Sequence, residues 1–174
     1  VGDFSKWLID KQFALRKIGN GNWQLEVPSD YIRHGQQYKL LVKWSDGEGY
    51  RLPSYANRVV QDEATKIFNA QVWMPDKAYQ WKNNFVPSWD LPLIYEAHVG
   101  MSSEEPKVST FREFENNVLP RIKKLGYNAL QLMAIQEHPY YGSFGYHVSN
   151  FFAVSSRFGT PDDLKSLIDK AHEM

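Results

Sequence analysis

The second half of the chain twice repeats one order, a short apolar run followed by a capped amphipathic helix. The apolar runs cover residues 93–99 and 128–135, and helix-start patterns follow at Thr110 and Thr160. Short runs rich in β-branched and aromatic residues are typical of parallel strands buried on both faces. Strand, helix, strand, helix with short returns predicts right-handed parallel units, in a doubly wound sheet or in a (β/α)₈ barrel.

Each helix start has a recognisable chemistry. Thr110 with Glu113 forms a capping box, and Pro161 suits the first helical position after Thr160. We expect Pro120 to kink the first helix and Gly126 to end it. The predicted buried faces are Phe111, Phe114, Val118, Ile122 and Leu125 in the first helix, and Leu164, Leu167, Ile168 and Ala171 in the second.

The first half of the chain has the pattern of short antiparallel strands. Apolar side chains alternate with polar ones, or follow one another, in residues 13–18, 23–27 and 38–44. Residues typical of turns lie at 19–22 and 46–47. This predicts a β-sandwich. Residues 51–92 are punctuated by proline, so we expect extended and irregular chain there.

Composition excludes several classes of function. The net charge is zero, so no basic surface for nucleic acid or an anionic membrane is expected. The chain has no cysteine and no visible signal peptide or membrane span, which favours a cytoplasmic location. Aromatic residues reach 15%, which suits either core filling or stacking against sugar rings.

The loop at 136–159 follows the second predicted strand, and in barrels such loops carry the active site. Long loops inside compact domains are usually functional. We expect Phe144, Phe151 and Phe152 to pack the loop down, and Glu96 and His98 to form a buried polar pair. His138 and His147 have no recurring metal spacing, so no metal is assigned. The remaining candidates in the loop are Glu137, His138, Tyr140, Tyr141, Tyr146 and His147.

Several motifs carry a family resemblance. They resemble motifs of the 1,4-α-glucan branching enzymes, which are members of glycoside hydrolase family thirteen in the α-amylase superfamily. The motifs are residues 95–103, Glu137-His-Pro, Gly145-Tyr-His-Val-Ser-Asn and Arg157-Phe-Gly-Thr. The resemblance implies cleavage of α-1,4-glucan, glycogen or amylose, and transfer of the segment to form α-1,6 branches in glycogen biosynthesis. The implied mechanism is a retaining double displacement between two carboxyl groups. No cofactor is implied.

The same resemblance implies roles for the loop residues. Tyr146 is expected to stack under the sugar at the cleavage subsite, while His147, His138 and Glu137 are candidates for binding substrate or shaping the loop. No catalytic residue is assigned within this chain, because the family's acids lie on later strands. We therefore expect a fragment that is inactive alone and self-associates through exposed barrel edges.

A second resemblance concerns the first half of the chain. Gly2-Asp-Phe-Ser-Lys-Trp7, Trp23 and Tyr38-Lys-Leu resemble the glycogen-binding module attached to branching enzymes. This implies glucan contacts at Trp7 and Lys39, with Trp44 or Tyr50 as a further aromatic. The module can also serve as a spacer packed on the barrel.

The expected architecture is multidomain, β plus α/β. It consists of an incomplete β-sandwich carbohydrate-binding module at 1–75, a linker at 76–92, and the first two βα units of a (β/α)₈ TIM barrel at 93–174. Two other functions stay open at this point. One is a non-catalytic glycogen-binding protein, and the other is a different amylase-superfamily hydrolase.

Overall fold

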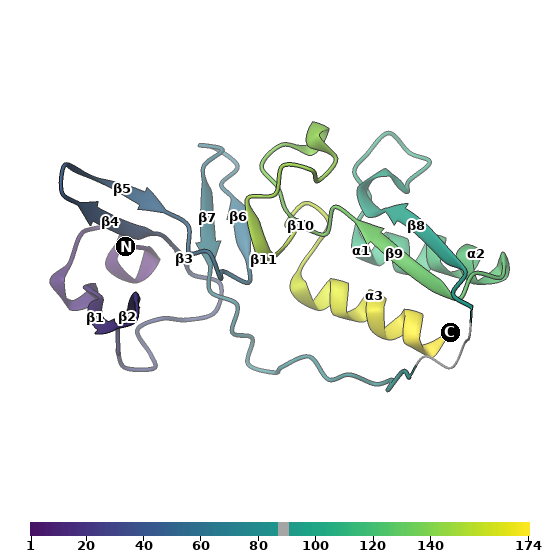
Figure 1. Ribbon diagram of the computed structural model, residues 1–174, viewed down its shortest axis with the longest axis horizontal. Helices are drawn as coiled ribbons and strands as arrows, with labels where there is room; N and C mark the ends of the chain where they lie inside the picture. Colours follow the sequence, from purple (N-terminus) through teal and green to yellow (C-terminus); the bar gives the residue numbers. More distant parts are fainter. Residues whose placement is uncertain (87–90) are drawn as a thin grey trace. The chain divides into compact units, whose positions relative to one another are not determined.

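A computed structural model describes residues 1–86 and 91–174 (Figure 1). The chain divides into two compact units, Val1–Asp76 and Lys77–Met174, and each is considered by itself. Part of the linker expected at 76–92, residues 87–90, lies outside the described residues. Within the described ranges, no helix has the length and apolar character that a membrane crossing requires.

The first unit is built from short antiparallel strands. β1 pairs with β2, β4 pairs with β5, and β7 lies between β3 and β6 in a three-stranded sheet. The elements are η1 (Asp3–Ser5), η2 (Lys11–Phe13), β1 (Arg16–Gly19), β2 (Asn22–Gln24), β3 (Gln37–Tyr38), β4 (Leu40–Trp44), β5 (Gly47–Arg51), β6 (Val59–Gln61) and β7 (Phe68–Gln71).

Both predicted turns of this unit are confirmed. Gly19, Asn20 and Gly21 all have positive φ and connect β1 to β2, a conformation that glycine and asparagine adopt at low cost. Trp44 pairs with Gly47, which leaves a two-residue turn between β4 and β5.

The expectation of irregular chain throughout residues 51–92 was wrong, because β6 and β7 form a hairpin there. Val59 pairs with Ala70, and both are fully buried. The connecting turn is fixed by Asp62, whose carboxylate accepts hydrogen bonds from the backbone and the hydroxyl of Thr65, each at 2.7 Å. The strands were missed because they are only three and four residues long, and β7 also pairs with β3, which lies far away in the sequence.

The second unit contains two parallel strands and the helices that connect and follow them. β8 (Ile94–His98) pairs with β9 (Ala129–Met133) in register from Ile94↔Ala129 to His98↔Met133. The other elements are η3 (Val99–Met101), α1 (Phe111–Glu113), the π-helical turn η4 (Phe114–Val118), α2 (Leu119–Lys124), β10 (Gln136–Glu137), η5 (Tyr141–Ser143), β11 (Asn150–Val154) and α3 (Pro161–Glu173).

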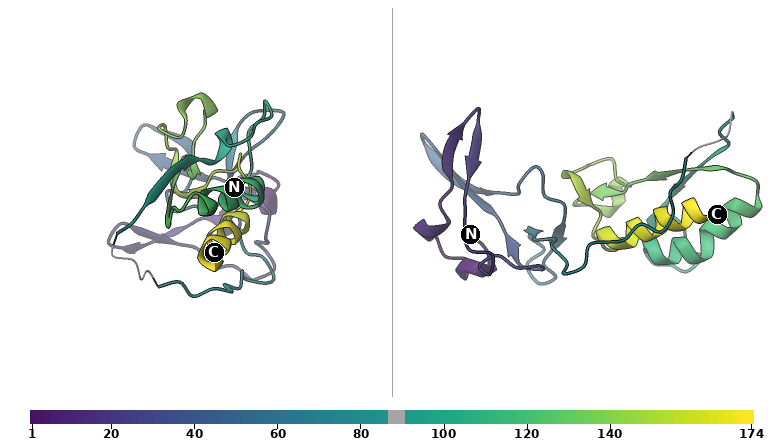
Figure 2. Two further views of the ribbon diagram at one scale, coloured as in Figure 1. Left: turned by 90° about the vertical axis from the view of Figure 1, so that its right-hand side faces the viewer. Right: turned by 90° about the horizontal axis from the view of Figure 1, so that it is seen from below.

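The helices of this unit start and stop where the sequence predicted. The capping boxes of Thr110 and Thr160 are both formed, and each threonine oxygen accepts a hydrogen bond from the backbone three residues on. Gly126 has φ of 91° immediately after α2. Figures 1 and 2 show α2 and α3 beside the β8–β9 pair. Their shared core is formed by Val99, Phe111, Phe114, Leu119, Ile122, Phe158, Leu164 and Leu167.

One part of the predicted helix face was wrong. Leu125 is 70% exposed, whereas Leu119, which was not expected inside, is buried. The π-helical turn at Phe114–Val118 precedes these residues. A π turn adds a residue to the helical repeat and so rotates everything after it relative to an uninterrupted α-helix.

The segment at 79–85, expected to be linker, packs on α3. Asp169, a buried carboxylate, accepts hydrogen bonds from the Tyr79 hydroxyl at 3.0 Å and from the backbone N–H of Lys82 and Asn83 at 3.0 and 2.9 Å. The Phe85 ring stacks on His172 with 5.1 Å between ring centroids. This stretch is therefore part of the second unit.

Candidate functional site

A short antiparallel pairing closes the base of the loop that the sequence singled out. Gln136 of β10 faces Val154 of β11, and Glu137 faces Asn150. The N–H of Ser155 also donates to the Ile135 carbonyl at 2.8 Å. Residues 138–149 are thus presented between two strands at the end of β9.

Glu137 ties the two sides of this loop together. It is fully buried, and its carboxylate accepts the N–H of Ser156 at 2.7 Å while its carbonyl accepts the N–H of Ser149 at 2.9 Å. Burial raises the pKa of the Glu137 carboxyl, and the N–H of Ser156 acts in the opposite direction. The geometry is that of a residue that closes the loop, and its second carboxylate oxygen, Oε1, is buried without a hydrogen-bond partner among the residues that the structure describes.

His138 is buried beside it. Its Nδ1 lies 2.9 Å from the Gln136 carbonyl oxygen, and its ring packs 5.9 Å from that of Phe158. A carbonyl can only accept, so Nδ1 is the donor in this contact. Like Glu137, His138 is buried inside the loop and packs against its other residues.

Tyr146 and His147 are placed differently, at the exposed surface of the loop. The Tyr146 side chain is 77% exposed, and its N–H donates to the Ser143 carbonyl at 3.0 Å. The preceding residues, Phe144 and Gly145, have φ of 52° and 85°. A flat, open ring at the end of a tight turn is suited to stacking against the apolar face of a sugar.

The backbone before Tyr146 is held against the end of β9. A Cβ added to Gly145 would lie 2.4 Å from the Ala134 Cβ, so only glycine fits. Ala134 itself has φ of 59°, a conformation that residues with a Cβ rarely adopt. The approach of these two residues fixes where the chain turns outward to Tyr146.

The expected buried pair of Glu96 and His98 was wrong. Glu96 is exposed, and its carboxylate accepts a hydrogen bond from Gln131 Nε2 at 2.9 Å across the β8–β9 pair. His98 instead packs among the rings of Tyr141, Phe144 and Phe158. The two side chains therefore take different partners, Glu96 on the neighbouring strand and His98 in the loop region.

The expectation that the loop phenylalanines pack the loop down was wrong for Phe151 and Phe152, whereas the half-exposed Phe144 still contacts the His98 ring. Phe144, Phe151 and Phe152 are all exposed, whereas Phe158 is fully buried. Phe158 contacts the rings of His98, Phe111 and His138 at centroid distances of 5.7, 5.8 and 5.9 Å. The sequence contained this residue in the Arg157-Phe-Gly-Thr motif, but nothing in its local pattern marked it as the centre of the loop.

In the first unit, the structure places two of the three expected glucan contacts on neighbouring segments. An isolated bridge between Gly2 and Tyr38 joins the chain that carries Trp7 to the chain that carries Lys39. Trp7 is exposed, with its indole N–H donating to Asp3 at 2.9 Å, and burial lowers the pKa of the Lys39 ammonium.

Trp44 lies elsewhere, at the far end of β4. Five residues along a strand correspond to about 17 Å, so Lys39 and Trp44 are too far apart to share one sugar ring. The exposed Trp44 ring covers Gly47 and Gly49, and the Arg51 guanidinium stands 5.4 Å from its centroid.

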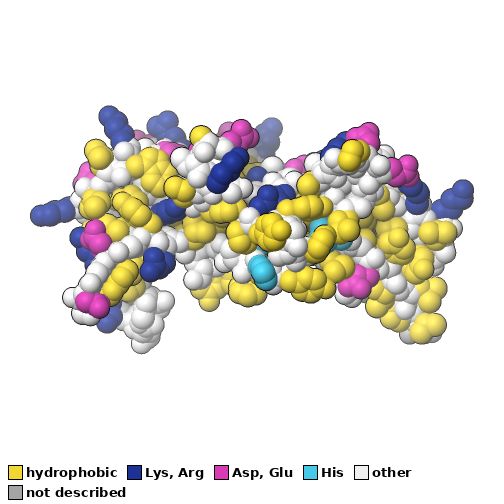
Figure 3. All heavy atoms as spheres, turned by 90° about the horizontal axis from the view of Figure 1, so that it is seen from above, with side chains coloured by type: hydrophobic (Ala, Val, Ile, Leu, Met, Phe, Trp, Pro, Cys, Tyr) yellow, Lys and Arg dark blue, Asp and Glu magenta, His cyan; other side chains and the backbone are white. Residues whose placement is uncertain are grey.

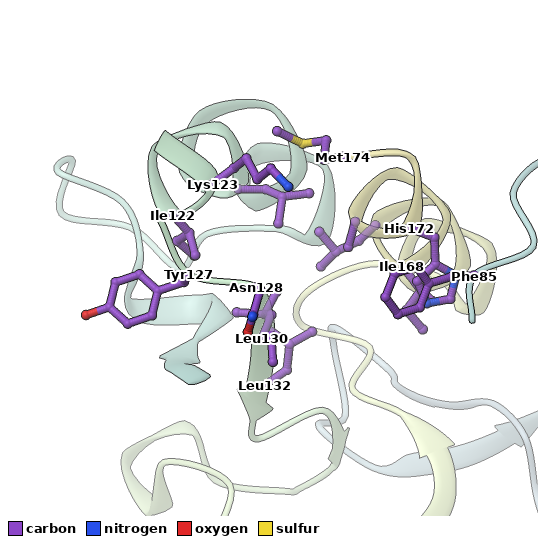
Figure 4. A pocket seen from close by; sticks show the side chains of 14 residues that line it. Phe85, Ile122, Lys123, Tyr127, Asn128, Leu130, Leu132, Ile168, His172 and Met174 are labelled. Atoms are coloured by element: carbon purple, nitrogen blue, oxygen red, sulfur yellow. The ribbon is translucent and has the colours of Figure 1, made fainter. Parts of the chain in front are cut away.

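A cavity of about 480 Å³ lies elsewhere in the second unit, between α2, α3 and β9 (Figure 4). Its wall is largely apolar, and Leu130, Leu132, Ile122 and Ile168 point toward it. None of the predicted site residues lines it. In the described part of the chain, no three histidine or acidic side chains gather in a way that could hold a metal ion.

Comparisons with known proteins match both the fold and the sequence. Residues 116–174 match the model of the alpha amylase catalytic domain. A solved structure of a putative alpha amylase from Salmonella typhimurium superposes with a TM-score of 0.73 and 27% identity, covering 91% of this chain and 25% of that one. The pullulanase SAP in complex with maltotetraose gives a TM-score of 0.71 over 91% of this chain and 26% of that one, at 19% identity, which speaks for the fold alone. The chain thus has the fold found in enzymes of the α-amylase family.

The sequence relatives are more specific. The chain is 47% identical to the 1,4-alpha-glucan-branching enzyme of Dictyostelium discoideum and 50% identical to that of Yarrowia lipolytica, over the whole chain and 26% of each relative. It is 46% identical to that of Solanum tuberosum, over the whole chain and 21% of that relative. The resemblance to 1,4-α-glucan-branching enzymes is therefore confirmed along the entire chain, which spans about a quarter of the length of these relatives.

Proposed function

We propose that this chain forms part of a 1,4-α-glucan-branching enzyme, which cleaves an α-1,4-glucan and transfers the released segment to a 6-hydroxyl in glycogen biosynthesis. One observation carries the proposal. Identities of 44–50% to branching enzymes extend over the whole of this chain, rather than over its barrel-like part alone. The glucan substrate, glycogen or amylose, and a cytoplasmic location belong to the same proposal.

The domain assignment is proposed as well. Residues 1–75 would form a glycogen-binding module, 76–92 a connection of which 79–85 packs on α3, and 93–174 the first two βα units of a TIM barrel. The parallel β8–β9 pair with a helical return supports the barrel assignment, as does the match to an alpha amylase catalytic domain from residue 116. The antiparallel sheets of the first unit support the module.

In this proposal, Tyr146 holds the sugar at the cleavage subsite by stacking. A retaining mechanism needs one carboxylate as nucleophile and a second carboxyl group as acid and base. Glu137 is buried and Glu96 is bonded to Gln131, so we assign neither of these roles to this chain. We place both carboxyl groups in the part of a branching enzyme that this chain does not span, and we expect the chain alone to be inactive.

The proposal can be tested by grafting. The chain would replace the matching quarter of the Saccharomyces cerevisiae branching enzyme, to which it is 46% identical over 189 aligned positions. The iodine spectrum of amylose treated with the graft should shift as branches form. The same graft carrying Tyr146→Ala is the matched control.

Two outcomes would contradict the proposal. Release of reducing ends without new α-1,6 linkages would favour a hydrolase of the same superfamily. An inactive graft, together with glycogen binding by the chain itself, would favour a non-catalytic glycogen-binding protein, for which the exposed Trp7 and Trp44 are the structural support.

A further inference from the structure

His98 stands at the point where β8 ends, and its ring contacts both ends of the turn that leads to Tyr146. Its centroid lies 6.2 Å from that of Tyr141, the first residue of η5, and 6.3 Å from that of Phe144, the residue after η5. Both contacts are edge-on, at interplanar angles of 87° and 81°. One imidazole therefore spans a turn that lies more than forty positions away in the sequence.

The ring has little freedom to shift. Phe158, fully buried, packs on it at 5.7 Å. A Cβ added to the nearby Gly100 would come within 2.6 Å of the Phe158 ring and 3.0 Å of the Tyr141 ring. The glycine allows these rings to close up around the end of β8, and His98 completes that packing.

The turn needs such support because its backbone is strained. Phe144 has φ of 52°, a left-handed conformation that is unfavourable for a bulky side chain. Two hydrogen bonds run within the turn, from Phe144 N–H to the Tyr141 carbonyl at 2.9 Å and from Tyr146 N–H to the Ser143 carbonyl at 3.0 Å. The contact of Gly145 with Ala134 holds one side, and His98 holds the other.

The surroundings of His98 disfavour the charged form of its ring. Burial is the main cause that lowers its pKa, and the nearby His138 acts in the same direction, while backbone hydrogen bonds, including one with Phe144, act against them. The Tyr141 phenol is a further ionisable group in contact with the ring. A neutral ring can pack edge-on among aromatic rings without the desolvation cost of a charge.

We propose that His98 is a positioning residue, whose ring packs against Tyr141 and Phe144 and so holds the turn that presents Tyr146. An effect of His98 on catalysis rests on the proposed function, because Tyr146 contacts a sugar only if that function is correct. An effect of His98 on the stability of the turn does not depend on the function. The effect on the turn and the effect on catalysis can therefore be tested separately.

The first test follows amide hydrogen exchange along the 174-residue chain. In His98→Ala, the amides of Phe144 and Tyr146 should exchange at least about tenfold faster, since both bonds lie in the turn. Amides of α3 should be unchanged. His98→Phe, which keeps a flat ring, should restore slow exchange, and His172→Ala in the same unit should leave the turn unaffected. Phe144→Ala removes the ring that contacts His98. It should speed exchange of the Tyr146 amide and leave exchange of the β8 amides unchanged.

Exchange in the turn that is unchanged in His98→Ala and in Phe144→Ala would overturn the proposal. A rise of equal size in the turn and in α3 would also overturn it, because that pattern belongs to a general loss of packing.

The second test uses the graft in the yeast enzyme. His98→Ala should lower kcat/KM in the same direction as Tyr146→Ala, and it should cause no further loss when Tyr146→Ala is already present. Losses that multiply would show that His98 acts by another route and would overturn the positioning role. An inactive wild-type graft counts against the proposed function, whereas the exchange experiment still decides the role of His98.

Discussion

Asp169 in α3 accepts a hydrogen bond from the hydroxyl of Tyr79, ninety positions earlier, at 3.0 Å. The same carboxylate accepts the N–H groups of Lys82 and Asn83, so one side chain on the helix fixes a whole stretch of extended chain. These hydrogen bonds to the ionised form lower the pKa of Asp169, although burial acts in the opposite direction.

The first prediction concerns this carboxylate. Asp169→Ala should lower the thermal unfolding midpoint of the second unit and free residues 79–83 for proteolysis. Because the pKa is lower in the folded state, the stabilisation is present above the ordinary value of 3.8 and is lost as pH falls through the folded pKa. Unfolding followed by circular dichroism from pH 6 to pH 2 should show a steeper acid loss in the wild type than in Asp169→Ala. Glu173→Gln, also on α3, is the control; parallel pH profiles for wild type and Asp169→Ala would contradict the assignment.

A second prediction compares two leucines in the helices of the second unit. Leu167 is fully buried, so Leu167→Ala should reduce the free energy of unfolding by about 2–5 kcal/mol. Leu125 is 70% exposed after the π-helical turn, so Leu125→Ala should change it by less than about 0.5 kcal/mol. Urea denaturation gives both values. Similar losses for the two variants would mean that Leu125 is in the core after all.

The third prediction concerns Tyr146 in the yeast graft. Tyr146→Ala should reduce branching activity by at least about tenfold, because it removes the ring that would stack on the sugar; a tenfold loss in rate corresponds to about 1.4 kcal/mol. Tyr146→Phe keeps the ring and should retain most of the activity. Because the side chain is 77% exposed, neither change should alter the unfolding midpoint of the chain. Equal activity in the alanine variant and the wild type would remove Tyr146 from the site.

The fourth prediction separates the exposed tryptophans of the first unit by affinity electrophoresis in gels that contain glycogen. Trp7→Ala should reduce retention, and Trp44→Ala should cause a separate, additional reduction, because Trp44 lies about 17 Å along the strand from Lys39. Trp23→Ala, which removes another exposed tryptophan, should leave retention unchanged. If all three variants migrate like the wild type, the module serves as a spacer.

The fifth prediction concerns self-association. Figure 3 shows many hydrophobic side chains at the surface. The exposed hydrophobic residues of the chain include Ile94 in β8 and Phe151 and Phe152 in β11. In the described part of the chain, β8 and β9 pair only with each other. Sedimentation velocity should therefore reveal concentration-dependent association, reduced in Ile94→Lys and in Phe151→Ser with Phe152→Ser. A single monomeric species at all concentrations would refute the prediction.

The features that the sequence predicted well are those set by neighbouring residues. The capping boxes of Thr110 and Thr160 and the glycine at 126 depend on side chains within a few positions, and all three are present. The motifs at 95–103, 137–139, 145–150 and 157–160 together carried the resemblance to branching enzymes, which the relatives confirm.

The features that it missed depend on contacts between distant segments. β7 takes one of its partners from β3, and Phe158 becomes the centre of the loop because His98 and Phe111 reach it from other elements. From the sequence, Asp169 is expected to be a solvent-exposed helix residue. Its burial is evident only in the structure, where the segment at 79–83 packs on it. Periodicity alone also could not register the π-helical turn, which moved Leu125 to the surface.

The contact between Gly145 and Ala134 has a consequence for anyone who diversifies this loop. No side chain fits at 145, and replacing Ala134 by glycine would not make room, because a Cβ at 145 would also lie 2.5 Å from the Ala134 Cα. The two backbones, rather than the Ala134 methyl group alone, exclude a side chain at this position. A library that varies this turn should therefore keep glycine at 145 and place its diversity at the neighbouring positions.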